Sequence, residues 1–191
     1  FVGFPRSGTT LMEEMLRAHP SLVTTEERSP LPHVRDGIAG TYPETLGNLT
    51  AAEAEAARAS YWDRARATLG AELEGRRLVD KLPLNIVEVG LVARLFRRAP
   101  VIVALRDPRD VVLSCFMQQF RLNDAMASFL TLAGVARLYA AVMDLWLHYR
   151  EILDLKYLEY RYEDLVAEPE QTARAVIEFI GEAWTDAVRD Y

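Results

Sequence analysis

Short apolar runs alternate with longer segments of helical periodicity along this chain. Four runs have the length and composition of β-strands, namely Phe1–Phe4, Leu78–Lys81, Pro100–Leu105 and Tyr157–Tyr162. The run at Pro100–Leu105 is apolar throughout and rich in β-branched residues, which is typical of a parallel strand buried on both faces. We therefore expect a sheet whose strands are joined by helices.

Apolar residues recur at helical spacing in most of the intervening sequence. Thr50 and Glu53 form a capping-box pattern, and Asp107-Pro108 has an N-cap residue followed by proline at the first helical position. The segment Ser21–Thr45 is rich in proline, glycine and polar residues, so we expect an irregular loop there. The expected helices cover residues 9–19, 50–69, 84–98, a segment from 107, one or two helices in 124–153, and 168–181.

This order of strands and helices predicts an α/β fold with a parallel central sheet flanked by helices. A length of 191 residues fits one domain, which we take as residues 1–191. The sequence starts within an expected strand and stops in charged, helix-like sequence. We expect the domain to be truncated at both ends.

Composition and charge narrow the function classes. Half of the residues are hydrophobic and the net charge is −6, which argues against general affinity for nucleic acid or anionic membranes. The single cysteine, Cys115, excludes an internal disulfide and a cysteine-based metal site, so we expect a reducing, cytoplasmic location. No apolar run reaches the length of a membrane span, and no metal-ligand spacing is present.

The opening FVGFPRSGTT resembles a phosphate-binding loop in which the residues after the second glycine are exchanged. Gly3 and Gly8 stand as in G-x-x-x-x-G, but Thr9 and Thr10 replace the lysine and hydroxyl residue of a nucleotide triphosphatase. A loop between strand and helix cradles an anion through backbone N–H groups. With Arg6 inside the loop and no such lysine, a phosphosulfate fits better than a triphosphate. A turn that only packs, or a degenerate nucleotide kinase, remains an alternative.

A second anion site is expected after the strand at Pro100–Leu105. Arg106 follows its carboxyl end, where ligands of open α/β sheets gather. Ser114 comes two helical turns later, on roughly the same side. An arginine fork with a hydroxyl suits a phosphate monoester. The alternative is that Arg106 pairs with Asp107 or Asp110.

These motifs together resemble those of sulfotransferases that use 3′-phosphoadenosine-5′-phosphosulfate (PAPS). PRSGTT resembles their 5′-phosphosulfate loop, which implies that Arg6, Ser7, Gly8, Thr9 and Thr10 bind the cofactor. Arg106 and Ser114 match their 3′-phosphate motif. YRYEDLVAEPEQTARAVIEFIG resembles a late family segment that would place Tyr162 beside the nucleotide. The resemblance implies a P-loop NTPase-like sulfotransferase fold, and it ends near Gly181, before the segment that closes over the adenine.

The pattern is closer to the protein-tyrosine and bacterial repeat-linked branches than to the cytosolic small-molecule branch. The tyrosine-sulfating enzymes have a further arginine four residues after the serine, where this chain has Gln118. The repeat-linked branch implies that an N-terminal repeat module is missing from this chain.

The resemblance also suggests which residues carry the chemistry. Arg6 can stabilise the bridging and sulfuryl oxygens, and its spacing to Glu27 matches that of the glutamate base in the tyrosine-sulfating branch. Lys81 precedes Leu82-Pro83, where cytosolic enzymes have a histidine. A lysine ammonium cannot accept the acceptor's proton, but it can neutralise developing charge. We therefore expect Arg6, Glu27 and Lys81 to be catalytic, with no metal.

Alternatives for the base remain. Glu26 and Glu27 are adjacent, and a neighbouring carboxylate would favour proton acceptance by one of them. Both could equally be solvated loop charges, and His33 is the rival base. His19 is expected to be structural at a helix end, and His148 lies far along the chain on another helix.

The expected function is sulfuryl transfer from PAPS to a hydroxyl or amine, with adenosine 3′,5′-bisphosphate as product. The acceptor could be a peptide, a carbohydrate, a lipid or another small molecule, and no nucleic acid is expected as a partner. Two alternatives are an atypical P-loop nucleotide kinase and a catalytically inactive nucleotide-binding relative.

Overall fold

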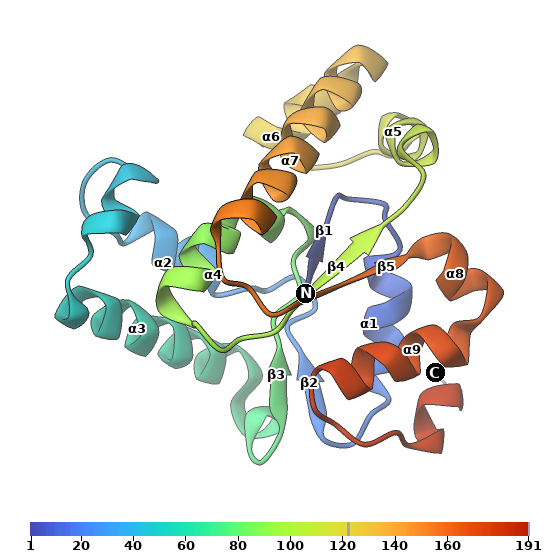
Figure 1. The fold of residues 1–191 in the computed structure, drawn as a ribbon, viewed down its shortest axis with the longest axis horizontal. Helices are drawn as coiled ribbons and strands as arrows, with labels where there is room; N and C mark the ends of the chain where they lie inside the picture. The colour runs from blue at the N-terminus through green and yellow to red at the C-terminus, as the bar shows by residue number, and fades with distance from the viewer. Residues whose placement is uncertain (122, 191) are drawn as a thin grey trace.

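The computed structural model describes residues 1–121 and 123–190. Strands β1 (Val2–Gly3), β4 (Val101–Leu105) and β5 (Tyr157–Arg161) form a parallel sheet in the order β1-β4-β5. Strands β2 (Leu22–Thr24) and β3 (Arg77–Val79) form a second parallel pair (Figure 1). The expected α/β architecture with a parallel sheet is confirmed.

The two sheets meet at β1. Val2 is in register with Val103 of β4, while the backbone nitrogen of Phe1 donates a hydrogen bond to the carbonyl oxygen of Asp80, just after β3, at 2.7 Å. This bond holds the end of β3 beside the start of β1, and so connects the sheet β1-β4-β5 to the pair β2-β3. Because the β1–β4 and β4–β5 pairings are parallel, the loops after β1, β4 and β5 leave the same edge of this sheet.

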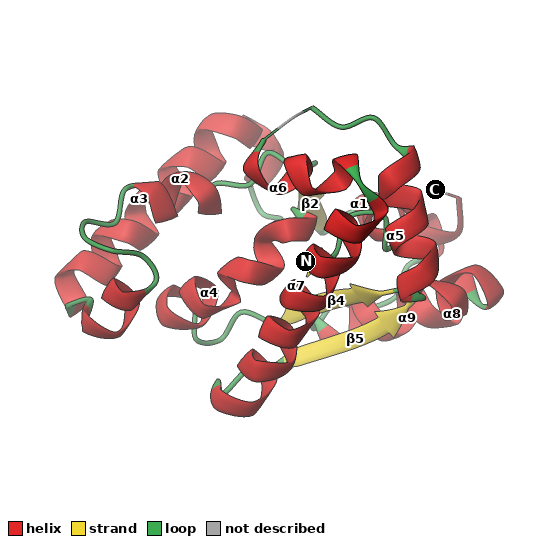
Figure 2. Cartoon of the chain, turned by 90° about the horizontal axis from the view of Figure 1, so that it is seen from above, coloured by secondary structure: helices red, strands yellow, loops and turns green. Residues whose placement is uncertain are grey.

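Helices cover both faces of this sheet (Figures 1 and 2). On one face, α1 (Thr9–Arg17), α8 (Tyr162–Ala167) and α9 (Pro169–Phe179) pack on β4 through Ile102 and Ala104. On the other, α4 (Val89–Leu95), α5 (Pro108–Met117) and α7 (Leu132–Ile152) pack through Val101 and Val103. Successive residues of β4 thus enter opposite cores, which explains why the strand is apolar throughout.

A third core lies to one side, between α2 (Leu31–Asp36), α3 (Ala51–Leu69) and α4. The predicted capping box opens α3, since Thr50 Oγ1 accepts from Glu53 N at 3.2 Å and Glu53 Oε2 accepts from Thr50 N at 2.8 Å. The remaining elements are short: α6 (Asp124–Ala127) and the 3-10 helices η1 (Glu44–Asn48), η2 (Gly70–Leu73), η3 (Pro83–Glu88), η4 (Ser128–Leu130) and η5 (Asp186–Asp190).

Two predicted segments differ from the structure. The loop expected at Ser21–Thr45 contains β2 and α2, whose three and six residues are too short to show periodicity. The helix expected at Leu84–Arg98 is divided into η3 and α4, and it ends at Leu95. Within the described residues, no helix is both long and apolar enough to cross a bilayer.

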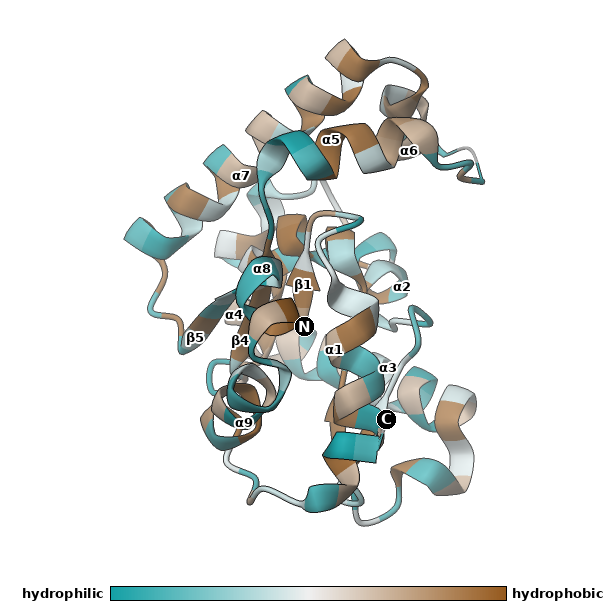
Figure 3. Ribbon diagram, turned by 90° about the vertical axis from the view of Figure 1, so that its right-hand side faces the viewer, coloured by the Kyte–Doolittle hydropathy of each residue, from teal (hydrophilic) through white to brown (hydrophobic). Residues whose placement is uncertain are grey.

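The outer end of α5 carries exposed hydrophobic side chains. Leu113, Phe116 and Met117 are 50%, 42% and 75% exposed, and Figure 3 shows this helix standing above the sheet beside α6 and α7. A separate cavity of about 390 Å³ is lined by Phe1, Tyr61, all of β3 and the start of β4, among other residues.

Candidate functional site

The loop between β1 and α1 has the backbone geometry of an anion-binding turn. Arg6 and Gly8 adopt left-handed conformations, with φ of 69° and 86°. Gly8 is the N-cap of α1, and no side chain of the described residues caps this helix. The N–H groups of the first turn are therefore left for a ligand, and the helix dipole adds a positive partial charge there. Ser7 and Thr9 are buried, while Thr10 is exposed.

Tyr162 connects this loop to the segment after β4. A Cβ placed on Gly8 would lie 2.2 Å from Cδ2 of Tyr162, so the ring rests directly against the glycine. On the same ring, the guanidinium carbon of Arg106 lies 4.5 Å from the centroid, a cation–π contact. Arg106 Nη1 also donates to the carbonyl oxygen of Arg6 at 3.1 Å. The two segments singled out in the sequence therefore meet.

Ser114 joins the same group from α5. Its Oγ accepts a hydrogen bond from Arg6 Nε at 3.0 Å. The structure thus brings together Arg6, Gly8, Arg106, Ser114 and Tyr162, which come from four separate segments of the chain. Gln118 is exposed at the end of α5, and its side-chain amide donates to the carbonyl oxygen of Gln119, at 3.4 Å.

Arg106 is only weakly neutralised. Its Nη2 is 3.6 Å from Asp110 Oδ2, and its buried Nε has no hydrogen-bond partner within the described part of the chain. Asp107 does not pair with it, because both Asp107 oxygens bind Arg109, at 3.0 and 2.7 Å. These bonds hold the pKa of Asp107 well below its ordinary value. The guanidinium of Arg106 therefore keeps capacity for an anionic ligand.

A second cluster lies against α1, one turn below the loop. Lys81 follows β3, and its side chain is only 2% exposed. Its Nζ lies 2.7 Å from Glu13 Oε2 and 2.8 Å from Glu27 Oε1. Glu13 is equally buried, but the side chain of Glu27 is 53% exposed. One ammonium thus joins a buried carboxylate to one that faces solvent.

The adjacent carboxylates of Glu26 and Glu27 bind different cations. Glu26 Oε1 binds Arg17 Nη1 at 3.0 Å, whereas Glu27 binds Lys81. Each carboxylate thus has its own cation, and both residues are in left-handed conformations, with φ of 47° and 66°. The assistance of Glu27 by the like charge of Glu26 stays a prediction.

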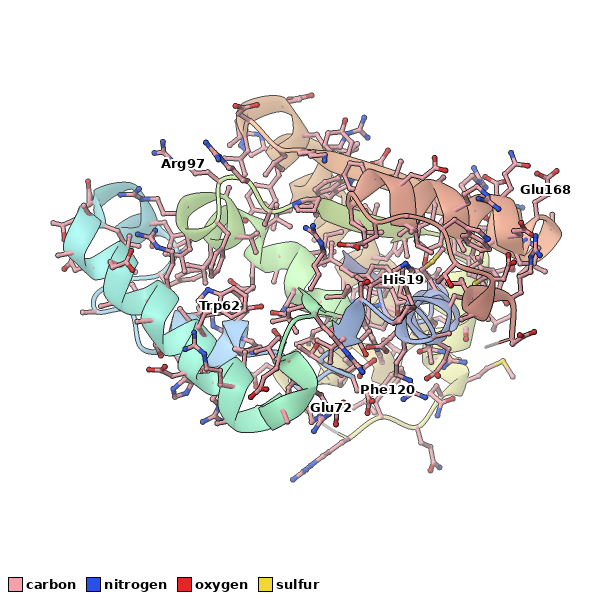
Figure 4. The ribbon with its side chains drawn as sticks, turned by 90° about the horizontal axis from the view of Figure 1, so that it is seen from below. His19, Trp62, Glu72, Arg97, Phe120 and Glu168 are labelled. Carbon is pink, nitrogen blue, oxygen red and sulfur yellow. The ribbon has the colours of Figure 1, made fainter. Side chains whose placement is uncertain are left out.

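The histidines occupy different environments. His19 is buried (Figure 4), where its Nδ1 accepts from Ser21 N at 3.2 Å and its Nε2 lies 2.8 Å from the carbonyl oxygen of Ala183. This arrangement fixes Nε2 as the protonated nitrogen and joins the end of α1 to the segment after α9. His33 on α2 and His148 on α7 are exposed.

Sequence reasoning missed Glu13 and a polar group around Asp80. The Asp80 carboxylate accepts from Tyr61 Oη at 2.8 Å and Ser29 Oγ at 3.0 Å, which holds the start of α2 near β3. The signal for Glu13 was its place on the buried face of α1, three residues before the fully buried Leu16. No group of histidine, cysteine and acidic side chains suited to a metal ion occurs among the described residues.

Comparisons with known proteins agree with this geometry. A model of the sulfotransferase family matches residues 1–186. The protein-tyrosine sulfotransferase 2 of Gallus gallus is 29% identical over 202 residues, covering 97% of this chain and 51% of that protein. The protein-tyrosine sulfotransferase of Drosophila melanogaster is 29% identical over 201 residues, covering 97% and 38%. The chain thus spans about half or less of the length of these relatives.

Solved structures share the fold. The sulfotransferase domain from the curacin biosynthetic pathway superposes with a TM-score of 0.64 at 22% identity, covering 98% of this chain and 74% of that one. A sulfotransferase from Alicyclobacillus acidocaldarius gives a TM-score of 0.56 at 17% identity, covering 100% and 87%. These likenesses establish the P-loop-like sulfotransferase architecture. With the family model matching nearly the whole chain, the protein belongs to the sulfotransferase family.

Proposed function

We propose that this chain transfers a sulfuryl group from PAPS to a hydroxyl or amine acceptor and releases adenosine 3′,5′-bisphosphate. The observation that carries the proposal is the contact of both Gly8 and Arg106 with the ring of Tyr162. With this contact, a glycine loop and a weakly neutralised guanidinium would each bind one anionic end of a single nucleotide. PAPS supplies the activated sulfuryl group.

The residues around this contact fit the two anionic groups of PAPS. The uncapped first turn of α1 and the loop from Arg6 to Thr10 would hold the 5′-phosphosulfate. Arg106 and Ser114 would hold the 3′-phosphate, and the Nε of Arg106, which has no partner among the described residues, would be one of its donors. The ring of Tyr162 would lie beside the nucleotide. Arg6, already bound to Ser114 Oγ, would carry positive charge towards the sulfuryl oxygens.

Glu27 is proposed as the general base. Lys81 binds its Oε1, and the half-exposed side chain leaves Oε2 for an acceptor hydroxyl. The carboxylate would accept the proton as the oxygen–sulfur bond forms. Lys81 would act in two ways, by orienting this carboxylate and by offsetting negative charge near the reacting atoms. His33, exposed on α2, is the rival base.

The acceptor class is proposed from the relatives of the chain. The named relatives are protein-tyrosine sulfotransferases, so a peptide hydroxyl is the first acceptor to test, followed by carbohydrates, lipids and other small molecules. The kinase alternative is disfavoured, because Thr9 stands where the phosphate-binding lysine would be and because the chain belongs to the sulfotransferase family.

Thermal shift measurements test the proposal without an acceptor. We expect adenosine 3′,5′-bisphosphate to raise the melting temperature of the chain, and ATP with magnesium to have little effect. Stabilisation by ATP with magnesium alone would refute the proposal. Labelled PAPS would then be offered with a panel of acceptors. Binding of the bisphosphate without any transfer would instead favour an inactive nucleotide-binding relative.

A further inference from the structure

Glu13 is a buried acid that the proposed chemistry has not yet used. Its Oε2 lies 2.7 Å from Lys81 Nζ, and its Oε1 accepts a hydrogen bond from Glu26 N at 3.2 Å. The side chain is only 4% exposed. One oxygen therefore binds the cation that holds Glu27, and the other binds the peptide N–H immediately before Glu27.

The backbone around Glu27 needs this support. Glu26 and Glu27 are both left-handed, a conformation that costs free energy for residues other than glycine. Two hydrogen bonds from main-chain N–H groups also hold the turn: Glu27 N donates to the carbonyl oxygen of Lys81 at 3.1 Å, and Lys81 N donates to the side-chain Oγ1 of Thr25 at 2.9 Å. Glu13 adds the contact from α1, and so connects the turn to the helix that begins at the anion-binding loop.

The cluster also divides one positive charge between two carboxylates. Lys81 is the cation of both Glu13 and Glu27. Its ammonium is buried, which strengthens the ion pair with the buried Glu13 more than the pair with the half-exposed Glu27. If Glu13 were neutral, the whole charge of Lys81 would be matched by Glu27. That carboxylate would then be stabilised in its charged form, and it would be a poorer proton acceptor.

The other charged side chains near Lys81 and Glu27 bind other partners. Arg17 binds Glu14 at 2.8 Å and Glu26 at 3.0 Å, and Arg28 lies 3.9 Å from Glu26. Asp80, next to Lys81 in sequence, binds the hydroxyls of Tyr61 and Ser29. Within the described residues, Lys81 is thus the cation that contacts Glu27, and Glu13 is the other carboxylate that contacts Lys81.

We propose that Glu13 is a positioning residue for sulfuryl transfer. It holds the turn that presents Glu27, and it takes part of the Lys81 charge so that Glu27 remains basic. This inference rests on the proposed role of Glu27 as the base. It assigns Glu13 no contact with the cofactor or the acceptor.

The test compares Glu13→Gln with Glu14→Gln, which removes a half-exposed carboxylate from the adjacent position of α1. Glutamine can still accept from Glu26 N but carries no charge. We expect Glu13→Gln to lower kcat about tenfold to a hundredfold, with the bisphosphate Kd unchanged. The acidic limb of its kcat–pH profile should move to lower pH, which a loss of packing alone would not cause. Turnover is followed as labelled sulfated acceptor or labelled sulfate released from PAPS.

Glu14→Gln should keep the wild-type kcat and profile. Glu13→Asp, which keeps the charge, should keep the position of the acidic limb and lower kcat less than Glu13→Gln. A wild-type kcat and pH profile in Glu13→Gln would overturn the inference. If Glu13→Gln does not fold, the inference is tested with Glu13→Asp. A shift in the acidic limb of the kcat–pH profile of Glu13→Asp would then overturn the inference. Failure of the proposed function would appear separately, as a wild-type chain that does not bind the bisphosphate or as full activity in Glu27→Gln.

Discussion

Arg106 and Gly8 contact the same aromatic ring, although they belong to different segments of the chain. The Arg106 guanidinium carbon is 4.5 Å from the centroid of Tyr162, and the Cα of Gly8 is so close to the ring that a methyl group would not fit. Arg106 also binds the carbonyl oxygen of Arg6, 100 residues earlier in the chain. Much of the proposed nucleotide site therefore depends on where β4 places Arg106 and where β5 places Tyr162.

Replacing Arg106 with alanine should weaken binding of adenosine 3′,5′-bisphosphate. The change removes a charged, partly buried donor of the 3′-phosphate, so we expect a loss of about 2–5 kcal/mol in binding free energy, measured by calorimetry. Arg109→Ala is the matched control, because Arg109 lies three residues away, is 89% exposed and pairs with Asp107. Equal affinity in the two variants would contradict the proposed 3′-phosphate site.

Gly8→Ala should disrupt both the fold and the ligand site. Alanine would be strained at φ 86°, and its methyl group would collide with Tyr162. We expect a loss of about 1–3 kcal/mol in the free energy of unfolding, together with loss of bisphosphate binding. Urea denaturation and calorimetry measure the two effects. Gly47→Ala, where a methyl group meets nothing within 4 Å, should be close to neutral.

Glu27→Gln should separate chemistry from binding. The amide cannot accept the acceptor's proton, so kcat should fall about 10²–10⁴-fold while bisphosphate affinity is kept. Glu26→Gln is the control, since Glu26 pairs with Arg17 rather than with Lys81. A Glu27→Gln enzyme that turns over at the wild-type rate would show that the base is elsewhere, and His33→Gln would be tested next.

The thiol of Cys115 should be unreactive in the folded chain. It is fully buried, its Sγ donates to the carbonyl oxygen of Pro5 at 3.3 Å, and burial raises its pKa to about 11. At pH 8 little thiolate is present, and reagent cannot reach it. We expect iodoacetamide to modify Cys115 only after unfolding, as measured by mass spectrometry. Rapid alkylation of the native chain would show that α5 opens readily from the loop.

Glu170 should make stability depend on pH in the acid range. Hydrogen bonds from Arg189 and then Arg174 lower the pKa of Glu170 to about 2 in the folded chain. Its stabilising contribution is therefore complete above the ordinary glutamate value of about 4.5 and is lost as pH falls towards 2. The difference in Tm between wild type and Glu170→Gln should shrink over that interval. A difference that stays constant would contradict this coupling between α9 and η5.

Local sequence signals predicted much of the fold. The buried strand β4, the Thr50 capping box and the Asp107 N-cap each depend on residues close together in the chain, and the structure contains all three. Strand β2 was not predicted, because three residues carry no period, and its parallel pairing with β3 is set by distant sequence.

The candidate site likewise has a part that the sequence could predict and a part that it could not. The glycine loop and Arg106 follow strands, so their placement at one edge could be anticipated from strand order alone. The pairing of Lys81 with Glu13 and Glu27 could not, because it joins α1, the turn after β2 and the end of β3. Its partners depend on how three separate segments pack, and no spacing along the chain encodes that.

The close fit between Gly8 and the Tyr162 ring has an evolutionary consequence. A larger residue at position 8 is tolerable only if position 162 becomes smaller in the same lineage, and a smaller residue at 162 also leaves Arg106 without its aromatic support. Descendants of this gene should therefore keep glycine at position 8, because a smaller residue at 162 would remove the collision but not the strain at φ 86°.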